Sequence, residues 1–130
     1  LHPDVSISLD VTTSMDTPMD KGINGLGKGV VLSVMDAGII ANKNFIAKME
    51  EICKDLDLDI NYDMMTCGGT DADNIHKAHD GVVTMTLSIP TCYMHSHRLI
   101  IHRKDYWQTV LLMAEFARRL DNELLQILKG

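Results

Sequence analysis

The stretch PDVSISLDVT, residues 3–12, decides the fold class of this 130-residue chain. Its apolar side chains alternate with polar ones, and the apolar positions are Val5, Ile7 and Leu9. A period of two is typical of a β-strand that buries one of its faces. We therefore predict a strand over residues 4–11, which ends at Asp10 and Val11.

Strand-like and helix-like segments alternate along the rest of the chain. Residues 12–29 are rich in glycine and predict a long irregular loop. Further strands are predicted over residues 30–34, 59–65 and 82–89, the last of them broken by Pro90. Helices are predicted over residues 42–57 and 103–128, with a short helical stretch after residue 71. This alternation indicates one domain with a layered α/β fold.

The overall composition argues against several classes of function. A net charge of −6 speaks against nucleic acid as the main partner, because phosphate binding requires clustered Lys and Arg side chains. No run of about 18 apolar residues occurs, so no membrane span is predicted. Three widely spaced cysteines form neither a disulfide framework nor a CxxC metal site, which indicates a reducing compartment such as the cytoplasm.

Potential metal ligands follow two of the predicted strands. Asp10 ends the first strand, where α/β sheets usually place ligand-binding groups, although capping of the next loop explains it equally well. His95 and His97 follow Pro90 and would face the same side of an extended backbone, which suits a metal or a catalytic pair. Taken alone, a solvated histidine pair is the simpler reading of these two residues.

A glycine turn, formed by Gly68, Gly69 and Thr70, follows a third predicted strand. The glycines permit close backbone approach and a positive φ, and the N–H groups that open the next helix can hold an anion or a polarised carbonyl. Most such turns are structural. His76 and His79 are spaced for one helical face, but the zincin pattern is absent because no carboxylate accompanies them.

Four segments occur in an order and at a spacing that are specific in combination: PDVSISLDVT (residues 3–12), LGKG (26–29), GGTDA (68–72) and SIPTCYMHS (88–96). Together they resemble the glutamyl or deblocking aminopeptidases, whose relatives are also labelled cellulase or endoglucanase M. The resemblance covers nearly the whole chain. It implies a layered mixed sheet flanked by helices, as in the C-terminal part of a zinc-exopeptidase-like catalytic domain.

The resemblance also implies roles for individual residues. Asp10 corresponds to a ligand of one divalent metal ion and His95 to a ligand of a second, with zinc or cobalt as the metals and manganese as an alternative. Gly68, Gly69 and Thr70 are expected to contact the substrate, a peptide that loses its N-terminal residue. In the family the remaining ligands and the Glu base precede the first of the four segments.

Residues 1–130 are therefore expected to be the C-terminal portion of a metallopeptidase catalytic domain, without its inserted β-barrel domain and N-terminal part. Alone, the chain is expected to bind metal weakly and to hydrolyse nothing. The family commonly assembles into homo-oligomers of twelve subunits, so a homo-oligomer is expected. Two alternatives are a non-catalytic domain with a role in assembly and a glycoside hydrolase, for which no facing carboxylate pair stands out.

Three positions depart from the pattern of the family that the chain resembles. Cys92 stands where the family usually has Arg, and a thiol cannot replace the contact of a guanidinium with a carboxylate. Leu99 stands in place of an acidic residue, and His102 in place of a frequent Asp. These changes affect the expected substrate preference and local ion pairs, not the two metal ligands.

Overall fold

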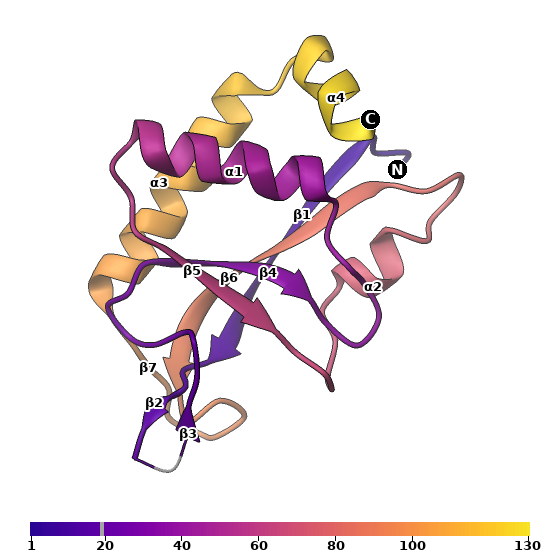
Figure 1. The fold of residues 1–130 in the computed structure, drawn as a ribbon. Coiled ribbons are helices and arrows are strands. Elements are labelled where there is room, and N and C mark those ends of the chain that lie inside the picture. Colours follow the sequence, from indigo (N-terminus) through magenta and orange to yellow (C-terminus); the bar gives the residue numbers. More distant parts are fainter. Residues whose placement is uncertain (19) are drawn as a thin grey trace.

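The computed structural model describes residues 1–18 and 20–130, which build a mixed β-sheet with helices on both faces (Figure 1). The strands of this sheet are β1 (Val5–Thr13), β4 (Val30–Met35), β5 (Ile60–Met64), β6 (Val83–Cys92) and β7 (Ile100–Ile101). Their order is β1-β6-β4-β5, and the short β7 pairs with β6. β1 runs parallel to β6, whereas β4 and β5 run antiparallel to that pair. The predicted α/β fold with a mixed sheet is confirmed.

The helices α1 (Lys43–Asp55) and α3 (Arg103–Arg119) lie together on one side of the sheet. Phe45 of α1 stacks on Phe116 of α3, with ring centroids 5.0 Å apart. α4 (Asn122–Lys129) packs against α1, and the single turn α2 (Ala72–Ile75) lies across the sheet from them (Figure 1). In the part of the chain that the structure describes, no helix is both long enough and apolar enough to cross a bilayer.

The two faces of the sheet carry different side chains, and β6 shows the difference most clearly. Its apolar side chains point towards α1 and α3, and they are Val83, Met85 and Leu87. The alternate side chains lie buried on the opposite face, and they are Thr84, Thr86 and Ser88. Strands buried on both faces are usually apolar throughout, so these hydroxyl groups mark a polar layer. Asp10 lies in this layer, because it is the register partner of Ser88 in the parallel pair of β1 and β6.

β1 is one of the two outermost strands of the sheet, and among the described residues it pairs with β6 alone. The N–H group of Ser14 donates to the carbonyl of Thr91, and that of Val83 donates to the carbonyl of Asp4. The even-numbered residues of β1 therefore face β6, whereas the odd-numbered residues turn their backbone groups outward. Leu9, one of these outward residues, is 58% exposed.

The prediction that Pro90 breaks its strand is wrong, because β6 continues to Cys92. The pairing of β4 with β6 ends at Ser88, so residue 90 has no partner in β4. The carbonyl of Thr91 faces β1, so the nitrogen of Pro90 points away from β1. A proline is tolerated at this position because neither neighbouring ladder needs an N–H group from it.

The single helix predicted over residues 103–128 is also wrong, because α3 and α4 are separate. Leu120 and Asp121 between them have extended backbone conformations. The side chain of Asp121 accepts a hydrogen bond from the N–H of Leu124 at 2.8 Å, which makes it the N-cap of α4. An Asp directly before helical residues signals the start of a new helix. Here this signal outweighs the apolar spacing that continues from α3 into α4.

The segment of residues 12–29 is more ordered than predicted. β1 extends into it as far as Thr13, and β2 (Asp16–Thr17) pairs with β3 (Asp20–Lys21) as a small hairpin. The end of the segment is tied to α3 by Asp105, which is fully buried. Its carboxylate accepts hydrogen bonds from the N–H groups of Gly27 at 2.7 Å and Gly29 at 2.9 Å.

Candidate metal centre

A cavity of about 480 Å³ brings together residues from three segments that the sequence marks as chemically distinctive. Asp10 comes from β1, His95 comes from the turn after β6, and residues 68–70 come from the turn before α2. The other residues that line the cavity are Val11, Met65, Cys67, Met94, Ser96 and Leu99. All five residues that the sequence suggests for a metal and substrate site therefore face one space.

Asp10 lies inside β1, three residues before its last residue, and not at the end of the strand as predicted. Its side chain is exposed, and its Oδ1 accepts a hydrogen bond from the N–H of Val11 at 2.7 Å. That bond uses one outward N–H group of the edge strand. The other oxygen, Oδ2, has no hydrogen-bond partner among the described residues, so it is free to bind a ligand.

His95 lies in a tight turn that follows β6, where both Tyr93 and His95 have left-handed φ values of 63° and 62°. A left-handed conformation costs a non-glycine residue about 1 kcal/mol or more and is frequent at functional sites. The prediction that His95 and His97 face the same side is wrong, because the backbone between them is not extended. Only His95 of this pair lines the cavity.

The turn at residues 68–70 presents backbone to the cavity. Gly68 has a φ of 84°, and a Cβ atom added at Gly68 or Gly69 would meet no other atom within 4 Å. The turn is therefore open on the side of the cavity. Its N–H groups at Gly68 and Gly69 have no hydrogen-bond acceptor among the described residues.

The turn is held from behind by Asp36, which follows β4 and is only 6% exposed. Its Oδ2 accepts from the N–H of Thr70 at 3.1 Å and from the hydroxyl of Thr70 at 2.9 Å, and its Oδ1 accepts from Gly38 and Ile39 at 2.8 and 3.0 Å. Burial raises the pKa of Asp36, but these hydrogen bonds outweigh burial and lower it. This contact joins residues 34 positions apart, so no local pattern in the sequence indicates it.

The cavity supplies two of the donor groups that a divalent metal ion prefers, a carboxylate and an imidazole. Among residues 1–18 and 20–130, no group of three or more His, Cys, Asp or Glu side chains is placed to hold a metal ion. Cys67 lines the cavity without forming such a group. At this cavity the described residues thus place one carboxylate and one imidazole.

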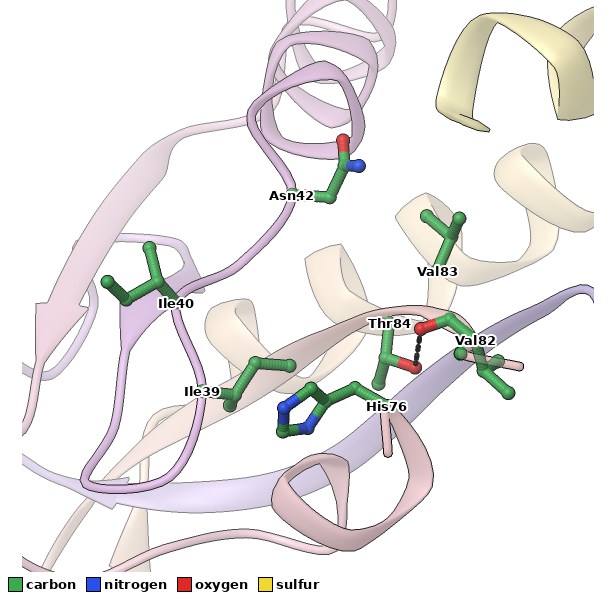
Figure 2. Close-up of a pocket in the computed structure, with 8 residues that line it drawn as sticks. Ile39, Ile40, Asn42, His76, Val82, Val83 and Thr84 are labelled. Carbon is green, nitrogen blue, oxygen red and sulfur yellow. Dashed lines mark hydrogen bonds between the residues drawn. The ribbon is translucent and has the colours of Figure 1, made fainter. Parts of the chain in front are cut away.

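A second cavity, of about 330 Å³, contains His76 among mostly aliphatic residues. Figure 2 shows the imidazole of His76 beside Ile39. The prediction that His76 and His79 share a helical face is wrong, because α2 ends at Ile75 and His79 has a φ of 53°. The Nδ1 atom of His76 donates to the carbonyl of Ala72 at 2.9 Å, and none of the other described residues that line this cavity has a carboxylate, imidazole or thiol.

Comparison with known proteins gives the same family as the resemblance of the motifs. The model of the M42 glutamyl aminopeptidase family matches residues 1–112. The lysyl aminopeptidase of Pyrococcus furiosus is 34% identical over 123 residues, which are 92% of this chain and 34% of that protein.

Solved structures agree with the sequence comparison. The TET aminopeptidase of the archaeon Thaumarchaeota archaeon SCGC AB-539-E09 has a TM-score of 0.93 and 30% identity, over 97% of this chain and 36% of that one. The TET1 peptidase of Pyrococcus horikoshii, described as assembling into a tetrahedron or a large octahedral shell, has a TM-score of 0.72 and 25% identity, over 88% of this chain and 33% of that one. The chain thus spans about a third of the length of these relatives.

Proposed function

The chain belongs to the M42 glutamyl aminopeptidase family, and we propose from this membership that it is part of a metal-dependent enzyme that removes N-terminal residues from peptides. One observation carries the proposal. Asp10, His95 and residues 68–70 are far apart in the sequence, yet they line one cavity on the polar face of the sheet. A carboxylate and an imidazole are metal ligands that a hydrolytic site can use, and an open backbone turn can bind the substrate.

We assign Asp10 and His95 to two different divalent ions, with zinc or cobalt as the metals and manganese as an alternative. The free Oδ2 of Asp10 and the exposed imidazole of His95 are available to bind, and this donor chemistry fits those metals. Ions bound there would lower the pKa of a shared water and polarise the scissile carbonyl.

The rest of the cavity would bind and orient the peptide. The N–H groups of Gly68 and Gly69 are free to donate hydrogen bonds to a peptide oxygen, because no described residue accepts from them. Val11, Met65 and Leu99 bring apolar surface to the same cavity, which would exclude water from part of the bound peptide.

Two donor groups do not complete a site for two metal ions, so we propose that other segments of a longer polypeptide supply the remaining ligands and the Glu base. We further propose that the complete protein acts in the cytoplasm and forms a homo-oligomer of up to twelve subunits. The large assemblies described for the Pyrococcus horikoshii relative support the oligomer.

The complete gene product tests the proposal directly. The protein is dialysed against a chelator and assayed with a panel of aminoacyl-p-nitroanilides, before and after zinc, cobalt or manganese is restored. We expect chelation to abolish release and one of the metals to restore it, whereas N-terminally acetylated substrates stay uncut. Absence of metal-dependent release from every member of the panel would contradict the proposed function.

Matched variants test the two ligands. Asp10→Asn and His95→Gln should each lower kcat at least about 100-fold, because loss of a ligand removes several kcal/mol of transition-state stabilisation. Metal content by mass spectrometry should fall from two ions per chain towards one. The controls are Asp4→Asn, directly before β1, and His97→Gln, in the same turn as His95. If the controls lose as much metal as the ligand variants, the assignment is wrong.

A non-catalytic role in assembly is a second candidate, favoured by the small number of metal donors in the cavity. The same assays separate the two, because an assembly domain would tolerate Asp10→Asn without any change in activity. A glycoside hydrolase is disfavoured by the lining of the cavity, where Asp10 is the one carboxylate among the described residues and glycoside hydrolysis needs two that face each other.

A further inference from the structure

Asp36 is a buried carboxylate that the proposed chemistry does not use. It accepts four hydrogen bonds, two from the backbone that follows it and two from Thr70. The N–H of Ala37 also donates to the carbonyl of Gly68 at 3.1 Å. Two consecutive residues after β4 therefore hold the turn that lines the cavity, although neither of them lines it.

The hydrogen-bond partners of Thr70 define the direction of a short chain of donors. An ionised carboxylate can only accept, so the hydroxyl proton of Thr70 points to Asp36. The hydroxyl of Thr86 lies 2.8 Å from that of Thr70 and must then be the donor of this pair. This series of hydrogen bonds runs from Thr86 in the interior strand β6 through Thr70 to Asp36, so it anchors the turn to the middle of the sheet.

The opposite side of the turn is open, as the glycines at 68 and 69 show. One side is thus fixed by a carboxylate, and the other lines the space that Asp10 and His95 also face. The N–H groups of Gly68 and Gly69 have no acceptor among the described residues. If the turn were flexible, peptide binding would lose free energy because the turn would have to become ordered. A turn that is already held in its binding conformation reduces this entropic cost.

We propose that Asp36 is a positioning residue, which holds the turn at residues 68–70 in the conformation that binds the peptide. This inference rests on the proposed function. It assigns to Asp36 an effect on the affinity for the substrate, and none on the metal ions or on the chemical step.

The test uses Asp36→Asn in the complete gene product. Asparagine has nearly the same shape, but an NH₂ group replaces one of the two carboxylate oxygens. This group cannot accept a hydrogen bond, so the two hydrogen bonds that the replaced oxygen accepted are lost. We expect KM to rise about tenfold, kcat to change less than about threefold and metal content to stay at the wild-type level. Hydrogen–deuterium exchange should become faster in peptides that contain residue 70. Thr86→Val, which removes the donor to Thr70, should raise KM by a smaller factor.

Asp105→Asn is the matched control. Asp105 is also a buried carboxylate that accepts hydrogen bonds from two backbone N–H groups, but these belong to a loop that does not line the cavity. This variant should lower the melting temperature and leave KM unchanged. An active enzyme in which Asp36→Asn leaves KM unchanged, or changes it no more than Asp105→Asn does, would overturn the positioning role alone. A wild-type protein without metal-dependent release would overturn the proposed function, and the positioning role with it.

Discussion

Asp105 and Gly29 are joined by a buried hydrogen bond of 2.9 Å, which ties the glycine-rich loop to the first turn of α3. The same carboxylate accepts from Gly27 at 2.7 Å. We predict that Asp105→Ala lowers the free energy of unfolding by about 2–4 kcal/mol, because two backbone N–H groups lose their acceptor. Urea denaturation followed by circular dichroism measures the change. As a control, Asp59→Ala should cost less than about 1 kcal/mol, because its pair with Lys104 is exposed; equal losses in both variants would contradict this explanation.

Gly29 itself cannot be replaced without strain. Its φ is 103°, and an added Cβ would lie 2.1 Å from the carbonyl oxygen of Asp59, which belongs to the backbone. We predict that Gly29→Ala destabilises the chain by about 2–4 kcal/mol, because a strained φ and a clash act together. Gly69→Ala should leave the free energy of unfolding within about 0.5 kcal/mol, since open space surrounds that position. In the complete enzyme Gly69→Ala should nevertheless raise KM, because its methyl group would occupy the cavity.

Asp121 begins a helix that the apolar pattern does not separate from the one before it. We predict that Asp121→Ala lowers the free energy of unfolding by about 1 kcal/mol, because the N–H of Leu124 loses its cap. The loss of stability should affect the whole domain and not α4 alone, because Leu124 and Leu128 of α4 belong to the hydrophobic core. Asp121→Asn keeps a capping oxygen and should change stability by no more than a few tenths of a kcal/mol. Equal losses in the two variants would argue against capping.

Cys53 should make the fold sensitive to alkaline pH. It is fully buried, and burial, with the nearby Glu50, raises the pKa of its thiol from 9.0 to about 11. The folded state therefore holds this proton more tightly, so its stabilising effect is complete below pH 9 and is lost as the pH rises through 11. We predict a loss of about 2 kcal/mol between pH 8 and pH 11 that is absent in Cys53→Ala.

The pH experiment needs an internal comparison, because Tyr62 also titrates at high pH. Its hydrogen bond to Glu50 and its burial raise its pKa to about 12. The measured quantity is thus the difference between wild type and Cys53→Ala in urea denaturation at each pH. A difference that is constant from pH 8 to pH 11 would show that Cys53 contributes only its volume to the core.

The spacing of apolar residues along the sequence was enough to predict individual strands and helices. The alternation in β1 and the helical spacing in α1 are properties of neighbouring residues, and both elements were placed within a few residues of their observed ends. Pro90 was misread, because its effect depends on which neighbouring strands need an N–H group, and strand order is not a local property.

The candidate site shows the same limit. The motifs around Asp10 and His95 indicated residues that do face a common cavity. The left-handed backbone of His95 was not predicted. The contact between Asp36 and Thr70 was not predicted either, because it joins two segments that only the assembled sheet brings together. A carboxylate directly after a buried strand and shortly before a glycine was the one signal in the sequence that could have identified Asp36.

The exposed edge of β1 has a consequence for any work with this chain in isolation. A strand of nine residues, unbroken by a bulge in its pairing with β6, offers a row of backbone donors and acceptors to any other extended segment. Two such chains can join through β1, and further copies can lengthen the resulting sheet through β5, the strand at its other end. Light scattering by the isolated chain would then report fibril-like growth and insolubility that are unrelated to the octahedral shell described for the Pyrococcus horikoshii relative. Solubility of the chain is thus expected to depend on whether the edge of β1 is covered.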